Sequence, residues 1–347
     1  MSKFIYSKMG GKNDAMFGKF EHPIKALIEN ESNACEKQKG VLNFLFNVEK
    51  SNRYAESIIG ESDFDTFQSV QEGQSAENDS VETTFKKVIE HIVFMKEFTI
   101  TREMADDSKI GISADIKSKP QKFVRAYYKT RNKIAAWALM NGTKTEGVFN
   151  KATVDLTAPD KLPLFSNAHT YGTEKMKGKT QSNYFYGDLS SDPARFEEVL
   201  GILANNVRNF KTEDGESMDY VADILILPCN RPKLEHMAKK VVGSERTVGS
   251  NHNDINTQYG NWSIVVLPGW ETTDDRIMVM SSEANKNLMG NMFYNRVPLD
   301  IRSNVDDHTR NYYWNGYCRF GVGFGSWKHI ALAVHSESAV DGATAIA

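Results

Sequence analysis

One long amphipathic segment, between Ser118 and Gly142, constrains the fold more than any other part of the sequence. Ser118 and Pro120 are typical of the start of a helix, and Asn141-Gly142 is typical of its end. A helix between these signals has roughly 20 residues and a length of ~30 Å. We therefore expect a single long helix here, along which other elements pack.

This helix has two different faces when its residues are placed at ~100° intervals. One arc is apolar and should pack, and a separate line of residues, the basic stripe, is cationic. The apolar arc contains Phe123, Val124, Tyr127, Tyr128, Ile134, Ala135, Ala138 and Leu139, and the basic stripe contains Lys122, Arg125, Lys129 and Lys133. Arg131 falls inside the apolar arc. Because an unpaired buried charge is costly, we expect Arg131 to be a buried structural charge with a carboxylate or carbonyl partner.

Two blocks of opposite charge stand out along the chain. Residues 54–85 contain eight acidic residues and no basic one, whereas residues 116–145 contain eight basic residues and no acidic one. The acidic block includes the polar stretch QEGQSAENDS, which is typical of turns and indicates a long excursion. As a hairpin it could reach ~50 Å at ~3.3 Å per residue, beyond the ~20 Å radius of gyration of a compact chain. Alternatively, both charge blocks are solvent-exposed surface without a partner.

The second half of the chain alternates between helix and strand. Asp192-Pro193 starts a helix, ADILILPCNRP predicts a buried strand, and a further helix is expected near residues 234–242. With the strands SIVVLPGW and RIMVMS these elements predict a mixed sheet covered by helices at about 191–299. The strand-rich tail RVPLDIRS, YYWNGYCRFGVGF and WKHIALAVH is expected to return to the long helix.

Composition narrows the function classes. The chain has 347 residues, enough for about two lobes, and 40% of them are apolar, so a packed globular protein is expected. The net charge of −3 excludes a polycation built to coat nucleic acid, and any role near DNA must use local patches. No apolar run is long enough for a signal peptide or a membrane span. Three widely spaced cysteines, Cys35, Cys229 and Cys318, favour a reducing compartment.

Motifs that could carry chemistry are incomplete. GKT at 178–180 lacks the glycine spacing and the preceding strand of a nucleotide-binding loop. The glycines 321, 323 and 325 alternate with apolar residues and predict a strand with a close backbone approach. Residues 306–308 (DDH) are expected to form a turn rather than to bind a metal ion. His169 is expected to lie in a loop or to pack in the core. We therefore expect no enzyme, no cofactor and no metal, although an active site assembled from scattered residues stays open.

The order of elements resembles that of the major capsid proteins of tailed bacteriophages, whose shell fold is named after phage Hong Kong 97. The order is acidic excursion, strand VIEHIVFMKEF, short helix TREMADDS, long helix ending KIAAWALMNG, mixed lobe and strand-rich return. More narrowly, the stretches LPLFSNAHT, ILILPCNRPKLEHMAK and RVPLDIRSNVDDHTRNYYWNGYCRFGVGFGSW resemble the Mu-like major head subunit family. The similarity covers about residues 50–333.

This resemblance implies an α+β Hong Kong 97-type capsid fold in four parts. They are an N-terminal arm (1–52), an extended loop (53–100), a peripheral domain with the long spine helix (101–190 and 300–347) and an axial domain (191–299). It also implies a virion protein, assembled in the host bacterial cytoplasm without a membrane, that forms hexameric and pentameric capsomers. These capsomers would close into an icosahedral shell that contacts double-stranded DNA non-specifically.

The resemblance also implies partners and leaves alternatives. The short arm favours a separate scaffolding protein, and a portal and a head-maturation protease are further expected partners. No motif for covalent crosslinking can be matched. The alternatives are an encapsulin-like compartment, which has the same shell fold and holds a protein cargo, and an uncharacterised enzyme.

Opposite charges suggest how neighbouring subunits meet. We expect the acidic loop, with Asp63, Asp65 and Glu72, to dock near the basic stripe of an adjacent subunit. The rival reading is that the basic stripe faces the lumen and DNA.

Overall fold

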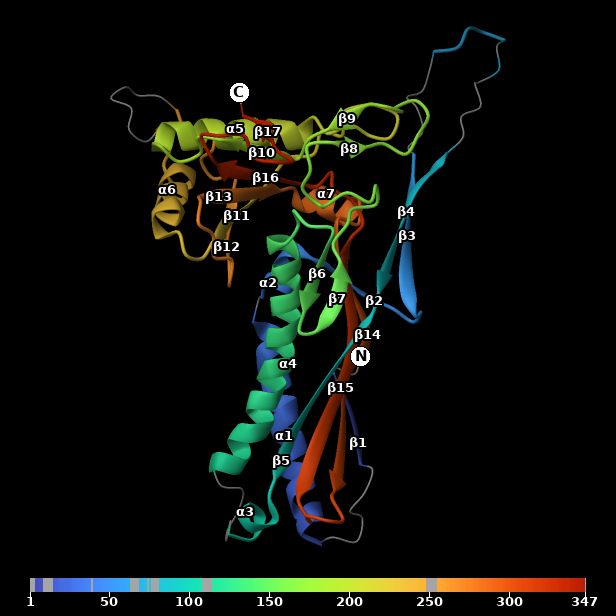
Figure 1. Ribbon diagram of the computed structural model, residues 1–347, viewed down its shortest axis with the longest axis vertical. Coiled ribbons are helices and arrows are strands. Elements are labelled where there is room, and N and C mark those ends of the chain that lie inside the picture. The colour runs from blue at the N-terminus through green and yellow to red at the C-terminus, as the bar shows by residue number, and fades with distance from the viewer. Residues whose placement is uncertain are drawn as a thin grey trace.

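The molecule is an elongated structure in which a broad upper part is carried on a narrower lower part (Figure 1). The computed structural model describes residues 4–8, 15–38, 40–62, 69–73, 75, 81–107, 114–247 and 255–346. Each part has its own sheet, and long strands connect the two parts.

The lower part is a sheet with helices along its length (Figure 1). Its strand order is β1-β14-β15-β5, and β2 also pairs with β14. The strands are β1 (Phe4–Lys8), β2 (Asn47–Lys50), β5 (Ile92–Ile100), β14 (Asn291–Val305) and β15 (Tyr312–Phe324). The helices are α1 (Ala15–Lys37), α2 (Val41–Leu45), α3 (Arg102–Asp107) and α4 (Ala114–Met140). Helix α1 packs along α4, and α4 in turn packs on β5 and β15.

The predicted long helix is α4, and its apolar arc forms the core of the lower part. Seven of the eight predicted arc residues are buried, and Tyr128 is half-buried. The aromatic ring of Phe98 on β5 stacks on Trp314 at 5.1 Å and contacts Phe123 at 5.1 Å. The helix begins at Ala114, before the expected start at Ser118, so Pro120 lies inside it. Ile116 in the added turn is fully buried, and this burial offsets the missing backbone hydrogen bond at proline.

The upper part is a mixed six-stranded sheet with the order β12-β11-β13-β16-β10-β17. Its strands are β10 (Tyr184–Gly187), β11 (Ile224–Pro228), β12 (Ser263–Leu267), β13 (Arg276–Met280), β16 (Ile330–His335) and β17 (Thr344–Ala345). The helices are α5 (Pro193–Arg208), α6 (Pro232–Gly243) and α7 (Ser282–Asn287). The predicted cap of α5 is present, because Asp192 accepts a hydrogen bond from the backbone N–H of Arg195 at 2.8 Å. All five residues of β11 are buried, as expected from their apolar run.

Two strands pair with a different sheet from the one expected for them. Strand β10 was expected in the peripheral domain, but it pairs with β16 in the six-stranded sheet. Strand β16 was expected beside the long helix, but it pairs with β13. Both strands are short and apolar, and their partners lie far away in the sequence, so a local pattern could not assign them to a sheet.

Four further short strands form two small hairpins on the body. They are β6 (Glu146–Phe149) with β7 (Ala152–Asp155), and β8 (His169–Thr170) with β9 (Thr180–Gln181). A third hairpin, β3 (Ala55–Glu61) with β4 (Thr83–Glu90), lies along one side of the molecule and is called here the extended hairpin (Figure 1).

Candidate subunit-interface surfaces

The extended hairpin is anchored to the body at its base. Ile58 and Ile89 from its two strands form a separate buried cluster with Met292 and Tyr294 of β14. Gly323 of β15 lies below β4, where an added Cβ would come within 2.8 Å of Ile89. An added Cβ at Gly321 would come within 2.7 Å of the backbone carbonyl oxygen of Glu90, so the close backbone approach expected for the alternating glycines is confirmed.

A buried lysine makes a second attachment of the extended hairpin. Lys87 of β4 donates hydrogen bonds from Nζ to Asp155 Oδ2 at 2.6 Å and to Thr157 Oγ1 at 2.7 Å. The Lys87 side chain is 5% exposed, and burial lowers its pKa. Burial by itself would raise the pKa of Asp155, but hydrogen bonds from Lys87 and Thr157 bring this pKa below its usual value. The pair therefore links the hairpin to β7 in the charged form.

The acidic residues expected to dock lie between β3 and β4 in the sequence. Asp63 and Asp65 lie outside the described residues. Glu72 lies in a turn and is exposed.

The basic stripe is exposed along α4, as the helical phase predicts. Lys122, Arg125, Lys129 and Lys133 are all exposed. Arg125 has a partner within its own chain, because its Nε lies 2.5 Å from Glu31 Oε1 on α1. Within the described ranges, no carboxylate lies at ion-pair distance from the three lysines of the stripe, which therefore can pair with another molecule.

Arg131 lies on a different side of α4 from the basic stripe. It is half-buried, and its guanidinium carbon lies 5.5 Å from the ring centre of Tyr127 and 5.2 Å from that of Phe293. Its Nε is buried and has no hydrogen-bond partner. In the part of the chain that the structure describes, Arg131 thus contacts aromatic rings, and no carboxylate lies at ion-pair distance.

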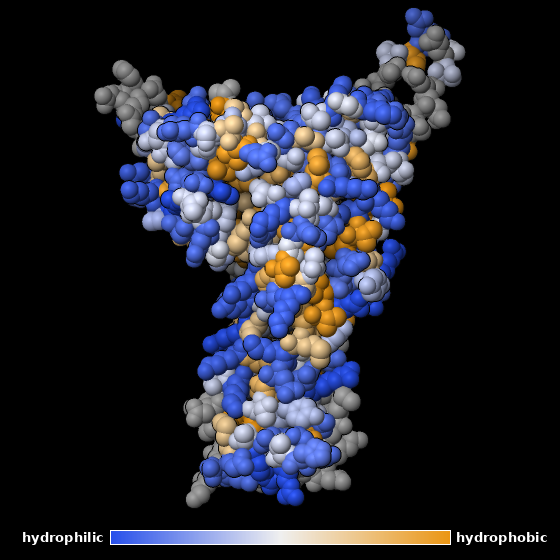
Figure 2. Space-filling model, in the orientation of Figure 1, coloured by the Kyte–Doolittle hydropathy of each residue, from blue (hydrophilic) through white to orange (hydrophobic). Residues whose placement is uncertain are grey.

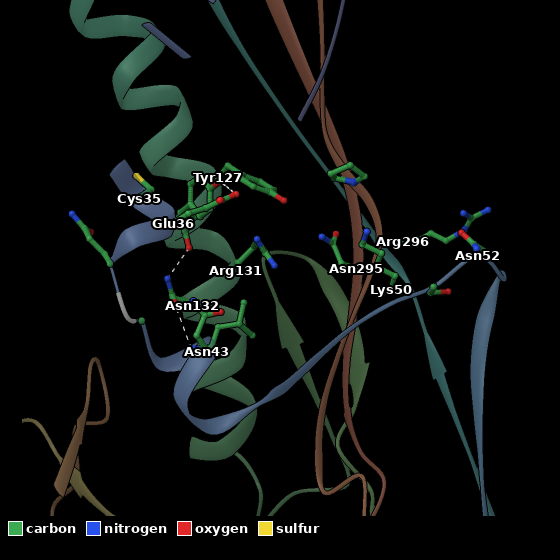
Figure 3. A pocket seen from close by; sticks show the side chains of 16 residues that line it. Cys35, Glu36, Asn43, Lys50, Asn52, Tyr127, Arg131, Asn132, Asn295 and Arg296 are labelled. Carbon is green, nitrogen blue, oxygen red and sulfur yellow. Dashed lines mark hydrogen bonds between the residues drawn. The ribbon is translucent and has the colours of Figure 1, made fainter. Parts of the chain in front are cut away.

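Arg131 also lines a cavity of about 520 Å³ between α1, α2, β2, α4 and β14 (Figure 3). Lys50 and Arg296 line the same cavity. Glu36, also in the lining, accepts a hydrogen bond from the Tyr128 hydroxyl at 3.0 Å. We call this space the α4 cavity. Lys50 and Arg296 lie on two separate strands, so no periodic pattern in the sequence connects them.

The remaining sequence motifs have structural roles. Gly178 is in a turn with φ +77°. His169 is fully buried, stacks on Trp327 at 4.4 Å and has its Nδ1 2.7 Å from Asp160 Oδ2. Asp306 accepts hydrogen bonds from the backbone N–H of His308 and the hydroxyl of Thr309, which closes the turn between β14 and β15.

The described residues include no group of three or more His, Cys, Asp or Glu side chains that could hold a metal ion. A search of the same residues finds no helix that is long and apolar enough to cross a membrane.

No family model and no curated protein matches the sequence. Solved structures do match. A structure from Mycobacterium phage Patience is 12% identical, with a TM-score of 0.50, and the match covers 94% of this chain and 89% of that chain. The capsid structure of the cyanophage P-SCSP1u is 8% identical, with a TM-score of 0.51, over 87% of this chain and 89% of that chain. At this identity the similarity shows the fold, and the α+β phage capsid fold predicted from the sequence is confirmed.

Proposed function

We propose that this chain is the major capsid subunit of a tailed bacteriophage, and that many copies form the hexameric and pentameric capsomers of an icosahedral shell. The observation that carries the proposal is the capsid fold over nearly the whole chain, which is shared with the cyanophage P-SCSP1u capsid. The extended hairpin supports it. This hairpin exposes Ile59 and Val88, at 49% and 44%, which a neighbouring subunit can cover.

The contact between subunits is heterologous, because the hairpin of one subunit reaches a different surface on the next. We place the acidic residues Asp63, Asp65 and Glu72 against the basic stripe of the adjacent subunit. Each exposed ion pair contributes only ~0 to 1 kcal/mol, but a shell repeats the contact at every subunit. The charges would therefore mainly set register and reject wrong partners.

The other parts of the proposal follow from the capsid role. The shell would enclose double-stranded DNA and contact it non-specifically, and its assembly would use a separate scaffolding protein, a portal and a head-maturation protease. Assembly would take place in the host bacterial cytoplasm. The proposed parts of the subunit are the arm at 1–52, the loop at 53–100, the peripheral domain at 101–190 and 300–347, and the axial domain at 191–299. Strands β10 and β16 pair within the sheet of the axial domain.

Electron microscopy of the purified chain tests this function. We expect closed shells or ring-shaped capsomers. A chain that stays monomeric at high concentration, both with and without a coexpressed scaffolding protein, would contradict the proposed capsid function. Shells that fill with protein instead of DNA when portal and terminase are coexpressed would favour an encapsulin-like compartment.

Charge reversal tests the contact. Changing Asp63, Asp65 and Glu72 to lysine should impair assembly, and adding glutamate at Lys122, Lys129 and Lys133 should partly restore it. The matched control reverses three exposed acidic residues elsewhere, Glu103, Glu337 and Asp341, and should assemble normally. If the doubly reversed chain assembles no better than the loop variant, the stripe is not the docking site.

A further inference from the structure

His91 lies where the extended hairpin joins the lower sheet. It is the single residue between the end of β4 at Glu90 and the start of β5 at Ile92. Its ring nitrogen Nε2 lies 2.8 Å from the hydroxyl oxygen of Ser51, which follows β2 on the segment that leads into β3. The two connections between the hairpin and the lower sheet therefore meet in one hydrogen bond.

This hydrogen bond is buried, and the other ring nitrogen of His91 has no partner. His91 is 8% exposed and Ser51 is 2% exposed. Among the described residues, nothing forms a hydrogen bond with His91 Nδ1, which lies against the backbone of β15 at Gly321. A neutral ring with its proton on Nε2 donates to Ser51 Oγ. A protonated ring must also place an N–H at Nδ1, where nothing accepts it, and a buried unpaired donor is costly.

The charges around His91 also oppose a proton on the ring. Burial lowers the pKa of His91 most, and Arg319 of β15 and Arg296 of β14 lower it further, whereas Glu56 of β3 acts in the opposite direction. Tyr294 of β14 lies edge-on to the ring at 6.4 Å and stays uncharged, because burial raises its pKa to about 12. The closed base of the hairpin therefore favours the neutral form of His91.

Beyond its base the extended hairpin has room to change its orientation. A cavity of about 290 Å³ lies between the hairpin and the upper part of the molecule. Ile59 and Phe85 of the hairpin line it on one side, and Leu288 and Trp327 of the body line it on the other. In Figure 1 the two strands of the hairpin run along one side of the molecule. A change at the base can therefore alter how the hairpin lies against the body.

We propose that His91 is a pH-sensitive latch at the base of the extended hairpin. When its ring is neutral, the hydrogen bond with Ser51 holds the two connections together. A proton on the ring favours an open base, in which His91 reaches water and the hairpin changes its orientation. All of the groups involved belong to one chain, so the inference does not depend on the assembly of a shell.

The direction and size of the pH effect follow from the two states of the base. His91 titrates near its ordinary pKa of 6.5 in the open base and at a lower pH in the closed base. Between these two values the open base binds a proton that the closed base does not bind, so acid favours opening. The equilibrium constant for opening should rise by up to about tenfold from pH 7.5 to pH 5.5. Asp155 stays ionised throughout this range, because its pKa lies below 3.8.

Hydrogen exchange of the purified full chain at pH 7.5 and pH 5.5 tests the proposal. The opening constant is obtained from peptides that cover residues 51–58 and 87–92, after correction for the intrinsic exchange rate at each pH. It should rise by up to about tenfold in the unchanged chain and by less than about twofold in His91→Gln, whose amide does not titrate. His308→Gln, in an exposed turn, is the matched control and should keep the full rise.

Arg319 provides a second test that keeps the histidine. Arg319→Gln removes a positive charge that opposes protonation, so the pKa of His91 in the closed base should move toward 6.5 and the rise should become smaller. Arg319→Lys retains the charge and should retain the rise. A full rise in His91→Gln, or equal rises in Arg319→Gln and Arg319→Lys, would overturn the proposal. If His91→Gln does not fold, the comparison of the two Arg319 variants decides.

Discussion

At the scale of single residues, buried polar side chains join elements that are distant in sequence, as His329 shows. His329 is fully buried, and its Nε2 lies 3.0 Å from Asn291 Oδ1. Asn291 donates its own amide to the Leu45 carbonyl at 3.0 Å, so its oxygen is the acceptor and His329 Nε2 carries the proton. Burial lowers the pKa of His329 to about 3. The folded protein therefore holds this ring in the neutral form.

This histidine predicts a pH dependence of stability. Between pH 6.5 and about 3 the unfolded chain binds a proton at this position that the folded chain does not. Stability contributed by neutral His329 is thus present above pH 6.5 and is lost as the pH falls, by at most ~1.4 kcal/mol per pH unit. His329→Gln should flatten the slope of the unfolding free energy measured by urea titration from pH 7 to pH 4.5. His308→Gln, in an exposed turn, is the control, and an unchanged slope in His329→Gln would refute the assignment.

A glycine predicts a packing effect at the hairpin base. An added Cβ at Gly323 would lie 2.8 Å from Ile89, so Gly323→Ala should destabilise the chain by ~1 to 3 kcal/mol through overpacking. Thermal unfolding measures the loss, and Ile89→Val in the same chain should recover part of it. Gly243→Ala, at the end of α6 where no atom lies within 4 Å of the added Cβ, should not destabilise.

At the scale of elements, the attachment of the extended hairpin depends on Lys87 and Asp155. The pKa of Asp155 is lower in the folded chain than its ordinary value of 3.8. The ion pair therefore stabilises the attachment fully above pH 3.8, and this stabilisation is lost as the pH falls through the pKa of Asp155 in the folded chain. Because Asp155 is 57% exposed, the contribution should be no more than ~1 kcal/mol.

Asp155→Asn should therefore increase hydrogen exchange in β3 and β4 at pH 7 by a few-fold, while β11 keeps its protection. Acidification below pH 3.8 should increase exchange in the unchanged chain but much less in the variant. Equal acid sensitivity of both chains would show that another group controls the attachment. Asp306→Asn, in a distant turn, serves as the control.

At the scale of the whole molecule, folding and assembly use different parts of the chain. The two sheets and α4 contain most of the buried apolar residues. Among the described residues, the extended hairpin contributes Ile58 and Ile89, both at its base. Figure 2 shows that the hydrophobic surface on this face lies mainly on the body, beside polar side chains.

Replacing residues 63–81 with a short Gly-containing turn should therefore leave the melting temperature within ~2 °C, because loop length has little effect on stability. The same change should abolish closed shells seen by electron microscopy, since the subunit loses its reach to the next one. Normal shells from the shortened chain would place the essential contact elsewhere. Shortening the turn at 306–310 instead should leave assembly intact.

The sequence by itself determined the local elements. The buried arc of α4, the cap of α5 at Asp192 and the buried strand β11 were all predicted correctly, because helical phase, capping and apolar runs depend on residues a few positions apart. The exposed basic stripe follows from the same phase. The order of these elements also carried the resemblance to the capsid fold.

Only the tertiary structure decided which elements meet. It placed β10 and β16 in one sheet with β13, paired Arg125 with Glu31, and put aromatic rings rather than a carboxylate beside Arg131. It also formed the α4 cavity from five separate elements. Each of these contacts joins residues tens to hundreds of positions apart, so its free energy depends on how distant surfaces pack, and no local pattern in the sequence encodes that choice.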